Sequence, residues 1–224
     1  MWEEKDKHNY HIHKINNIGQ ICNDDFSLYI KSLASNSNYK YYLEIGTWNG
    51  LGSTKQFIEG FLSRNDNFIF YSLECNKDKS NEAKDMYSNL ITSGEINILN
   101  EVLFQNNNEI NEINKIFPQT INNKMYKNWN DIDIKNMEKC NLFLERSNLP
   151  QIFDVILLDG GEFTTYFEFH LLKNRCKFLL LDDINTDKCK LIVKEIRNNN
   201  DKWKILVENT KVRNGFMICI NLKI

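Results

Sequence analysis

Residues 41–53 read Tyr41-Tyr42-Leu43-Glu44-Ile45-Gly46-Thr47-Trp48-Asn49-Gly50-Leu51-Gly52-Ser53, and this stretch decides the fold. Its first five residues are mostly apolar and predict a buried strand, and a helix is expected from Leu51 to about Leu62. The glycine-rich turn between them lets the backbone come close to a ligand, and the helix N-terminus offers free N–H groups and positive dipole. The stretch therefore predicts a corner that binds an anion or a nucleotide.

Apolar strands and helices alternate from residue 39 onward, which is typical of βαβ units and a parallel sheet. Two last strands are joined by a short polar loop with no room for a crossover helix, so they predict an antiparallel hairpin. The predicted strands are 41–45, 68–74, 95–99 with an extension to 102 left open, 153–159, 177–183, 203–208 and 215–222, and the helices between them include 77–90 and 186–197. The fold class is thus α/β, a mostly parallel seven-stranded sheet with helices on both faces.

The length of 224 residues suits one sizeable core. We expect an N-terminal helical extension at 1–38 and one main domain at 39–224. The alternation lapses at about 105–150, which is interpreted as an insertion with a helix at 136–145. It either caps a substrate site or forms a surface excursion, and both interpretations stay open.

Composition indicates an ordinary globular protein. The net charge of −2 gives no electrostatic footprint for nucleic acid or an anionic membrane, and no apolar run approaches the ~20 residues of a membrane span. The six cysteines are scattered without a C-x-x-C pair, which favours reduced thiols in a cytoplasmic protein. Assembly into a homo-oligomer stays open.

The glycine spacing narrows the choice of ligand. A dinucleotide fingerprint would read G-x-G-x-x-G, whereas this chain has Glu44-x-Gly46-x-x-x-Gly50-x-Gly52. That pattern resembles motif I of the class I S-adenosylmethionine (SAM) dependent methyltransferases, whose Rossmann-like sheet also ends in an antiparallel hairpin. The resemblance runs from about Tyr39 to the C-terminus. It implies SAM as cofactor, and the residues it places on the cofactor in this stretch are Glu44, Gly46, Thr47, Gly50 and Ser53.

Three strand ends extend the resemblance along one edge of the sheet, where open α/β folds bind ligands. Glu74 ends the second strand, where the family holds both ribose hydroxyls, and a carboxylate can accept two such hydrogen bonds. Asn100 follows the third strand, where the family contacts adenine. Asp159 ends the fourth strand, beside the expected methyl-transfer centre. Each alone could be a solvated strand end, but their joint placement favours a cofactor site.

Within the class, Leu158-Asp159-Gly160-Gly161 and Leu181-Asp182-Asp183 look like the subgroup that methylates hydroxyls of small molecules and sugars. Members of that subgroup often bind a divalent metal, which implies Asp159, Asp182 and Asp183 as oxygen ligands for Mg²⁺. Helix capping and strand-end solvation are the alternative. Relatives often carry a histidine where this chain has Glu162, so Glu162 and Asp159 are both candidates for the general base.

The expected activity is SAM-dependent O-methylation of a small hydroxylated acceptor, such as a sugar or a surface-glycan precursor. A catalytically inactive SAM-binding subunit or assembly module is the alternative, because the cofactor motifs would survive in it. The glycine spacing disfavours an NAD(P)-dependent enzyme. Nucleic-acid methylation is disfavoured by the lack of a basic patch and of an Asn/Asp-Pro-Pro-Tyr-like motif after the fourth strand.

Overall fold

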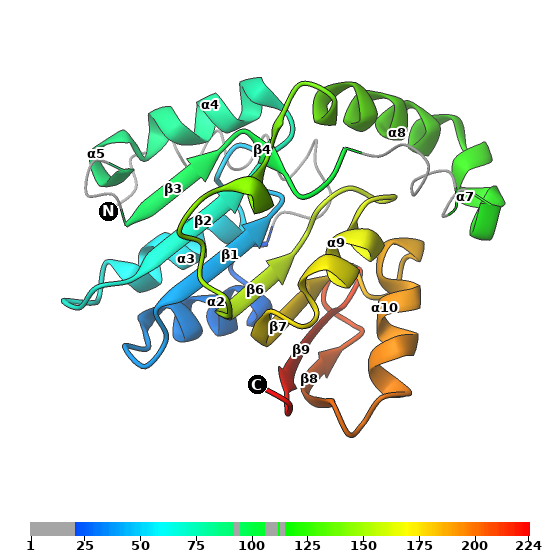
Figure 1. The fold of residues 1–224 in the computed structure, drawn as a ribbon. Coiled ribbons are helices and arrows are strands. Elements are labelled where there is room, and N and C mark those ends of the chain that lie inside the picture. Colours follow the sequence, from blue (N-terminus) through cyan, green and yellow to red (C-terminus); the bar gives the residue numbers. More distant parts are fainter. Residues whose placement is uncertain (1–20, 92–94, 106–111, 113–114) are drawn as a thin grey trace.

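The computed structural model describes residues 21–91, 95–105, 112 and 115–224, and a twisted seven-stranded sheet lies at its centre (Figure 1). The strand order is β3-β2-β1-β6-β7-β9-β8. The strands are β1 (Tyr41–Ile45), β2 (Ile69–Leu73), β3 (Ile96–Leu99), β6 (Phe153–Leu158), β7 (Cys176–Asp182), β8 (Trp203–Asn209) and β9 (Phe216–Asn221). This architecture confirms the predicted fold class.

The first five strands of the sheet are parallel, and the last two form the predicted hairpin. β9 runs antiparallel to both β7 and β8. In the middle of the sheet, β1 pairs with β2 on one side and β6 on the other, so their carboxyl ends lie side by side. This arrangement brings the ends of β1, β2, β6 and β7 to one edge.

Two hydrophobic cores sandwich the sheet, because neighbouring residues of each buried strand point to opposite faces. Tyr42 packs into the core under α2, α3 and α4, whereas Leu43 packs into the core under α9 and α10. These helices are α2 (Asp25–Ser35), α3 (Ser53–Phe61), α4 (Lys77–Met86), α9 (Thr165–Leu172) and α10 (Asp187–Arg197). Helices therefore cover both faces, as the sequence predicts.

Two predicted elements are divided in the structure. The helix expected at 77–90 is α4 followed by the short α5 (Ser88–Ile91), and the break falls at Tyr87. The third strand does not run on to residue 102, because β4 (Glu101–Val102) leaves the main sheet and pairs with β5 (Asn141–Leu142).

The insertion contains a helix, but not at the predicted 136–145. The long helix is α8 (Lys124–Met137), which follows the short α7 (Pro118–Asn122), and residues 141–145 form β5 and a 3₁₀ turn (Phe143–Glu145). Asn123 starts α8 by accepting a hydrogen bond from the backbone N–H of Met125. Leu142 cannot continue a helix, because its backbone pairs with Val102. The prediction of a helix at 136–145 is therefore wrong.

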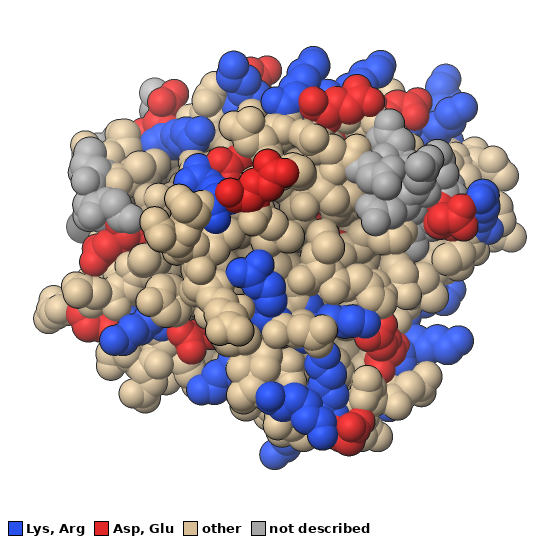
Figure 2. Space-filling view, viewed as in Figure 1, with Lys and Arg blue, Asp and Glu red and all other residues tan. Residues whose placement is uncertain are grey.

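The expected N-terminal extension falls partly outside the described residues, which begin at Ile21 and include α2. None of the described helices is long and apolar enough to span a membrane. Figure 2 shows basic and acidic side chains interspersed over the face in view, so no surface of a single sign dominates it.

Candidate cofactor and acceptor site

The turn after β1 is held in a conformation that requires glycine. Gly46 has a φ of +99°, and a Cβ there would lie 2.1 Å from the backbone oxygen of Asp159. The neighbouring Trp48 has a φ of +49°, and its backbone N–H donates to Glu74 at 2.7 Å. Close contact between the ends of β1 and β6 thus fixes the shape of this corner.

Glu44 lies beneath this turn in the core. Its Oε2 accepts hydrogen bonds from the hydroxyls of Thr54 and Ser72, and Thr47 bonds in turn to Ser72. Burial raises the pKa of the Glu44 carboxyl to about 7. Glu44 is therefore connected to the turn through a chain of hydroxyl hydrogen bonds that ends at Thr47.

Glu74 sits at the end of β2 and links two loops. Its Oε2 accepts from Trp48 N, and its Oε1 accepts from Asn76 N at 2.8 Å. Each carboxylate oxygen has two acceptor positions, so one on each oxygen is left for a pair of ligand hydroxyls. The side chain lines a cavity although only 7% of the residue is exposed.

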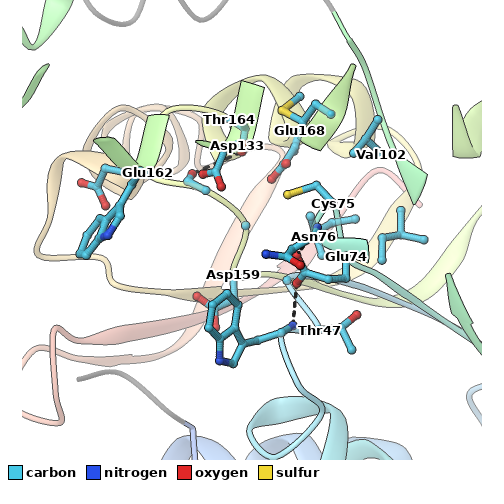
Figure 3. A pocket seen from close by; sticks show the side chains of 18 of the residues that line it. Thr47, Glu74, Cys75, Asn76, Val102, Asp133, Asp159, Glu162, Thr164 and Glu168 are labelled. Carbon is cyan, nitrogen blue, oxygen red and sulfur yellow. Dashed lines mark hydrogen bonds between the residues drawn. The ribbon is translucent and has the colours of Figure 1, made fainter. Parts of the chain in front are cut away.

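A cavity of about 590 Å³ opens at this edge of the sheet (Figure 3). Its floor comes from the ends of β1, β2, β6 and β7, and α8 from the insertion contributes Trp129, Ile132 and Asp133 to its wall. The insertion therefore contributes to the pocket, which favours the cap interpretation. The predicted site residues that line the cavity are Gly46, Thr47, Ser53, Glu74, Asp159, Glu162 and Asp183.

Four predicted residues do not line the cavity. Glu44 lies below it, Gly50 accepts a hydrogen bond from the Tyr87 hydroxyl at 2.7 Å, and Asp182 lies behind Asp183. Asn100 donates to the backbone oxygens of Glu74 and Cys75 at 2.8 and 3.0 Å. In this position Asn100 fixes the loop after β2, and its contact with adenine stays a prediction.

The three predicted metal ligands do converge. One carboxylate oxygen from each of Asp159, Asp182 and Asp183 lies within 4.8 Å of the other two. Lys188 Nζ lies 2.5 Å from Asp159 Oδ1 and 3.1 Å from Asp183 Oδ2. Arg213 donates one hydrogen bond to each oxygen of Asp182, both at 2.9 Å. Two cations of the chain itself therefore neutralise most of the acidic trio.

The protonation states of this group follow from burial and charge. Burial acts to lower the pKa of the Lys188 ammonium, but Asp159 and Asp183 outweigh it and raise that pKa well above its ordinary value. Burial acts to raise the pKa of Asp183, whereas Lys188 and Asn214 lower it, and the net shift is downward. Lys188 and Asp183 therefore form a charged pair.

Beyond Glu74 and the acidic trio, the cavity lining includes Glu101, which pairs with Arg146, and three other carboxyl groups. Figure 3 shows Asp133 and Glu168 near each other, with Glu162 farther to the left. These three are the other carboxyl groups of the lining. Burial raises the pKa values of all three carboxyl groups, to about 7 for Asp133 and Glu168. Glu168 Oε2 has no hydrogen-bond partner among the described residues. A carboxyl group with a raised pKa can accept a proton near neutral pH.

Four residues around this site were not predicted from the sequence, namely Asp133, Glu168, Lys188 and Arg213. The burial of Lys188 could have been predicted, since it lies on the same side of α10 as the buried Ile192 and Ile196, at four-residue spacing. No sequence pattern marked Arg213, because it reaches Asp182 from the β8–β9 loop with a φ of +50°. Asp133 was obscured by the misplaced helix in the insertion.

No family model and no curated protein sequence matches the chain. Solved structures do match it. An O-methyltransferase from Bacillus cereus in complex with SAH superposes at a TM-score of 0.56 and 12% identity, over 99% of this chain and 92% of that one. The O-methyltransferase TomG from Streptomyces achromogenes, involved in tomaymycin synthesis and solved with SAM, gives 0.58 and 13%, over 99% and 91%.

A methyltransferase from Geobacter sulfurreducens also gives a TM-score of 0.58, at 9% identity, over 99% of this chain and 91% of that one. The matches span nearly the whole of each chain. The chain thus has the class I SAM-dependent methyltransferase fold.

Proposed function

We propose that the chain is a SAM-dependent methyltransferase that transfers a methyl group to a hydroxyl oxygen of a small acceptor. The observation that carries the proposal is that Gly46, Glu74, Asp159 and Glu162 all line the same cavity. Those residues come from three strand ends of a fold that other proteins use to bind SAM or SAH.

The residues of the cavity fit this cofactor. Glu74 offers two acceptor positions for the ribose hydroxyls, and Cys75, Val102 and Leu103 give the neighbouring wall an apolar character suited to a flat base. Bound SAM would supply a methyl group on a positively charged sulfur, which keeps the S–C bonding pair as the acceptor oxygen forms the new C–O bond. The protein then has to orient the acceptor and take its proton.

Glu162 is the better candidate for the general base. It lines the cavity, burial raises its pKa, and no ion pair to its carboxylate is found in the described part of the chain. Asp159 lines the same cavity, but its Oδ1 is held by Lys188. The acceptor proton therefore passes to Glu162 in this proposal, while Asp159 positions the groups around it.

The acceptor is proposed to enter beneath α8. Trp129 and Ile132 give this wall an apolar surface, and the acids beside it can accept hydrogen bonds from hydroxyl groups. A sugar or a surface-glycan precursor remains the expected acceptor class.

Binding and turnover test the proposal separately. Calorimetry should show SAH binding at micromolar affinity and no binding of NAD, and the reverse result would remove the proposed function. A screen of nucleotide sugars and small phenols, with SAM consumption as readout, should then give turnover. Glu162→Gln should lower kcat by 10²-fold or more, a typical contribution of a general base, with the SAH affinity unchanged. SAH binding without turnover on any acceptor would instead favour the inactive SAM-binding subunit.

A further inference from the structure

The acidic trio Asp159, Asp182 and Asp183 is the group that would hold a divalent metal in this fold. Mg²⁺ prefers six oxygen ligands in near-ideal octahedral geometry at about 2.0–2.1 Å. Both oxygens of Asp182 face the Arg213 guanidinium, and each accepts a hydrogen bond from it at 2.9 Å. One oxygen of Asp183 is bound to Lys188 and the other to the side-chain amide of Asn214 at 3.0 Å. These residues do not fit a metal as they stand.

The charges lead to the same conclusion. When all three carboxyl groups are ionised they carry −3 and the two cations carry +2, so the group has a formal charge of −1. A divalent ion between the carboxylates would lie close to the Lys188 ammonium, which already occupies the space between Asp159 and Asp183. The ion could enter only if Lys188 left.

Lys188 is built into its position. Its side chain is 5% exposed, and it projects from the first turn of α10, immediately after the loop that carries Asp183. A buried ammonium that lost its carboxylate partners would carry a large desolvation cost, so Lys188 and the trio hold each other in place. Arg213 in turn forms ion pairs with both Asp182 and Asp24, at the start of α2, which hold Asp182 in place.

We propose that Lys188 takes the place of the divalent cation, so that this methyl transfer needs no metal. An ammonium group has three N–H donors, and Lys188 gives two of them to Asp159 and Asp183. Lys188 also lines the cavity, so its third donor can hydrogen-bond to the acceptor oxygen. The contact with the acceptor rests on the proposed function, whereas the exclusion of metal from the trio does not.

Titration with Mn²⁺, followed by its electron paramagnetic resonance signal, tests the exclusion directly. The wild-type protein should show no stoichiometric site, because Lys188 fills it. Lys188→Met keeps most of the length of the side chain but removes the ammonium group, and it should bind one Mn²⁺ at least ten-fold more tightly than the wild type. Lys188→Arg keeps the positive charge and should not gain a site. Lys190→Ala, on the exposed side of the same helix, is the matched control.

Turnover supplies the second arm of the test. Wild-type activity should be unchanged in EDTA, and Lys188→Met should lose at least ten-fold in kcat while its SAH affinity is retained. A stoichiometric Mn²⁺ site in the wild type, or activity that EDTA abolishes and Mg²⁺ restores, would overturn the proposal. If Lys188→Met does not fold, the wild-type titration still decides. A protein that binds neither SAH nor Mn²⁺ would contradict the proposed function but not the exclusion of metal.

Discussion

Glu74→Ala should weaken cofactor binding strongly, because this carboxylate is expected to hold both ribose hydroxyls. Two hydrogen bonds to a charged group are worth about 2–4 kcal/mol together after exchange with water. Since each 1.4 kcal/mol is a factor of ten, the SAH dissociation constant should rise roughly 30-fold to several hundred-fold.

The same substitution has a structural cost. It removes the acceptors for Trp48 N and Asn76 N, which lie 2.7 and 2.8 Å from the carboxylate. Water can reach these groups from the cavity, so the protein should fold with a lowered Tm. Calorimetry with SAH should be run well below that Tm, on a sample whose far-ultraviolet circular dichroism matches the wild type.

Glu82→Ala is the matched control for the loss of charge. Glu82 lies on α4, and its side chain is 48% exposed beside Lys79, so its removal should leave the SAH dissociation constant unchanged. An unchanged dissociation constant in a folded Glu74→Ala variant would refute the ribose role. Equal weakening by both variants would show that long-range charge is responsible.

Two further predictions concern the turn and the buried acids. Gly46→Ala should lower the Tm and abolish SAH binding in a thermal-shift assay, because a left-handed φ for alanine costs about 1–3 kcal/mol before its Cβ meets the Asp159 backbone. Burial raises the pKa of Glu168 from 4.5 to about 7, so its ionisation in the folded state lowers stability as pH rises through that range. Glu168→Gln should match the wild type in urea unfolding at pH 4 and exceed it by up to about 3 kcal/mol at pH 8. An equal gain at both pH values would refute the titration argument.

The sheet could be predicted from the sequence because its strands are short apolar runs between glycine or polar turns. β1 has the predicted bounds, and the polar loop between β8 and β9 left only a hairpin as their connection. The insertion could not be predicted in the same way. Its helix α8 buries only Asn130 and Met137, so no apolar stripe marked its position.

The candidate site was predictable where it depends on strand ends. Asp159 lies beside the Asp182-Asp183 pair because β6 and β7 are neighbouring parallel strands with Leu158 opposite Leu181. Residues that reach the site from elsewhere were not predictable. Asp133 comes from the insertion and Arg213 from a loop beyond β8, and neither position follows from the spacing of motifs.

The two cations also fit the charge of the proposed cofactor. SAM carries a sulfonium, an ammonium and a carboxylate, so its net charge is +1. At full ionisation the trio with Lys188 and Arg213 carries −1, which attracts a cation such as SAM. Lys188 engages Asp159 through Oδ1, which leaves Oδ2 of a cavity-lining carboxylate to face a cationic ligand. In the proposed arrangement, the Lys188 ammonium in the metal position would organise the acceptor end of the cavity and keep its potential favourable to a cationic methyl donor.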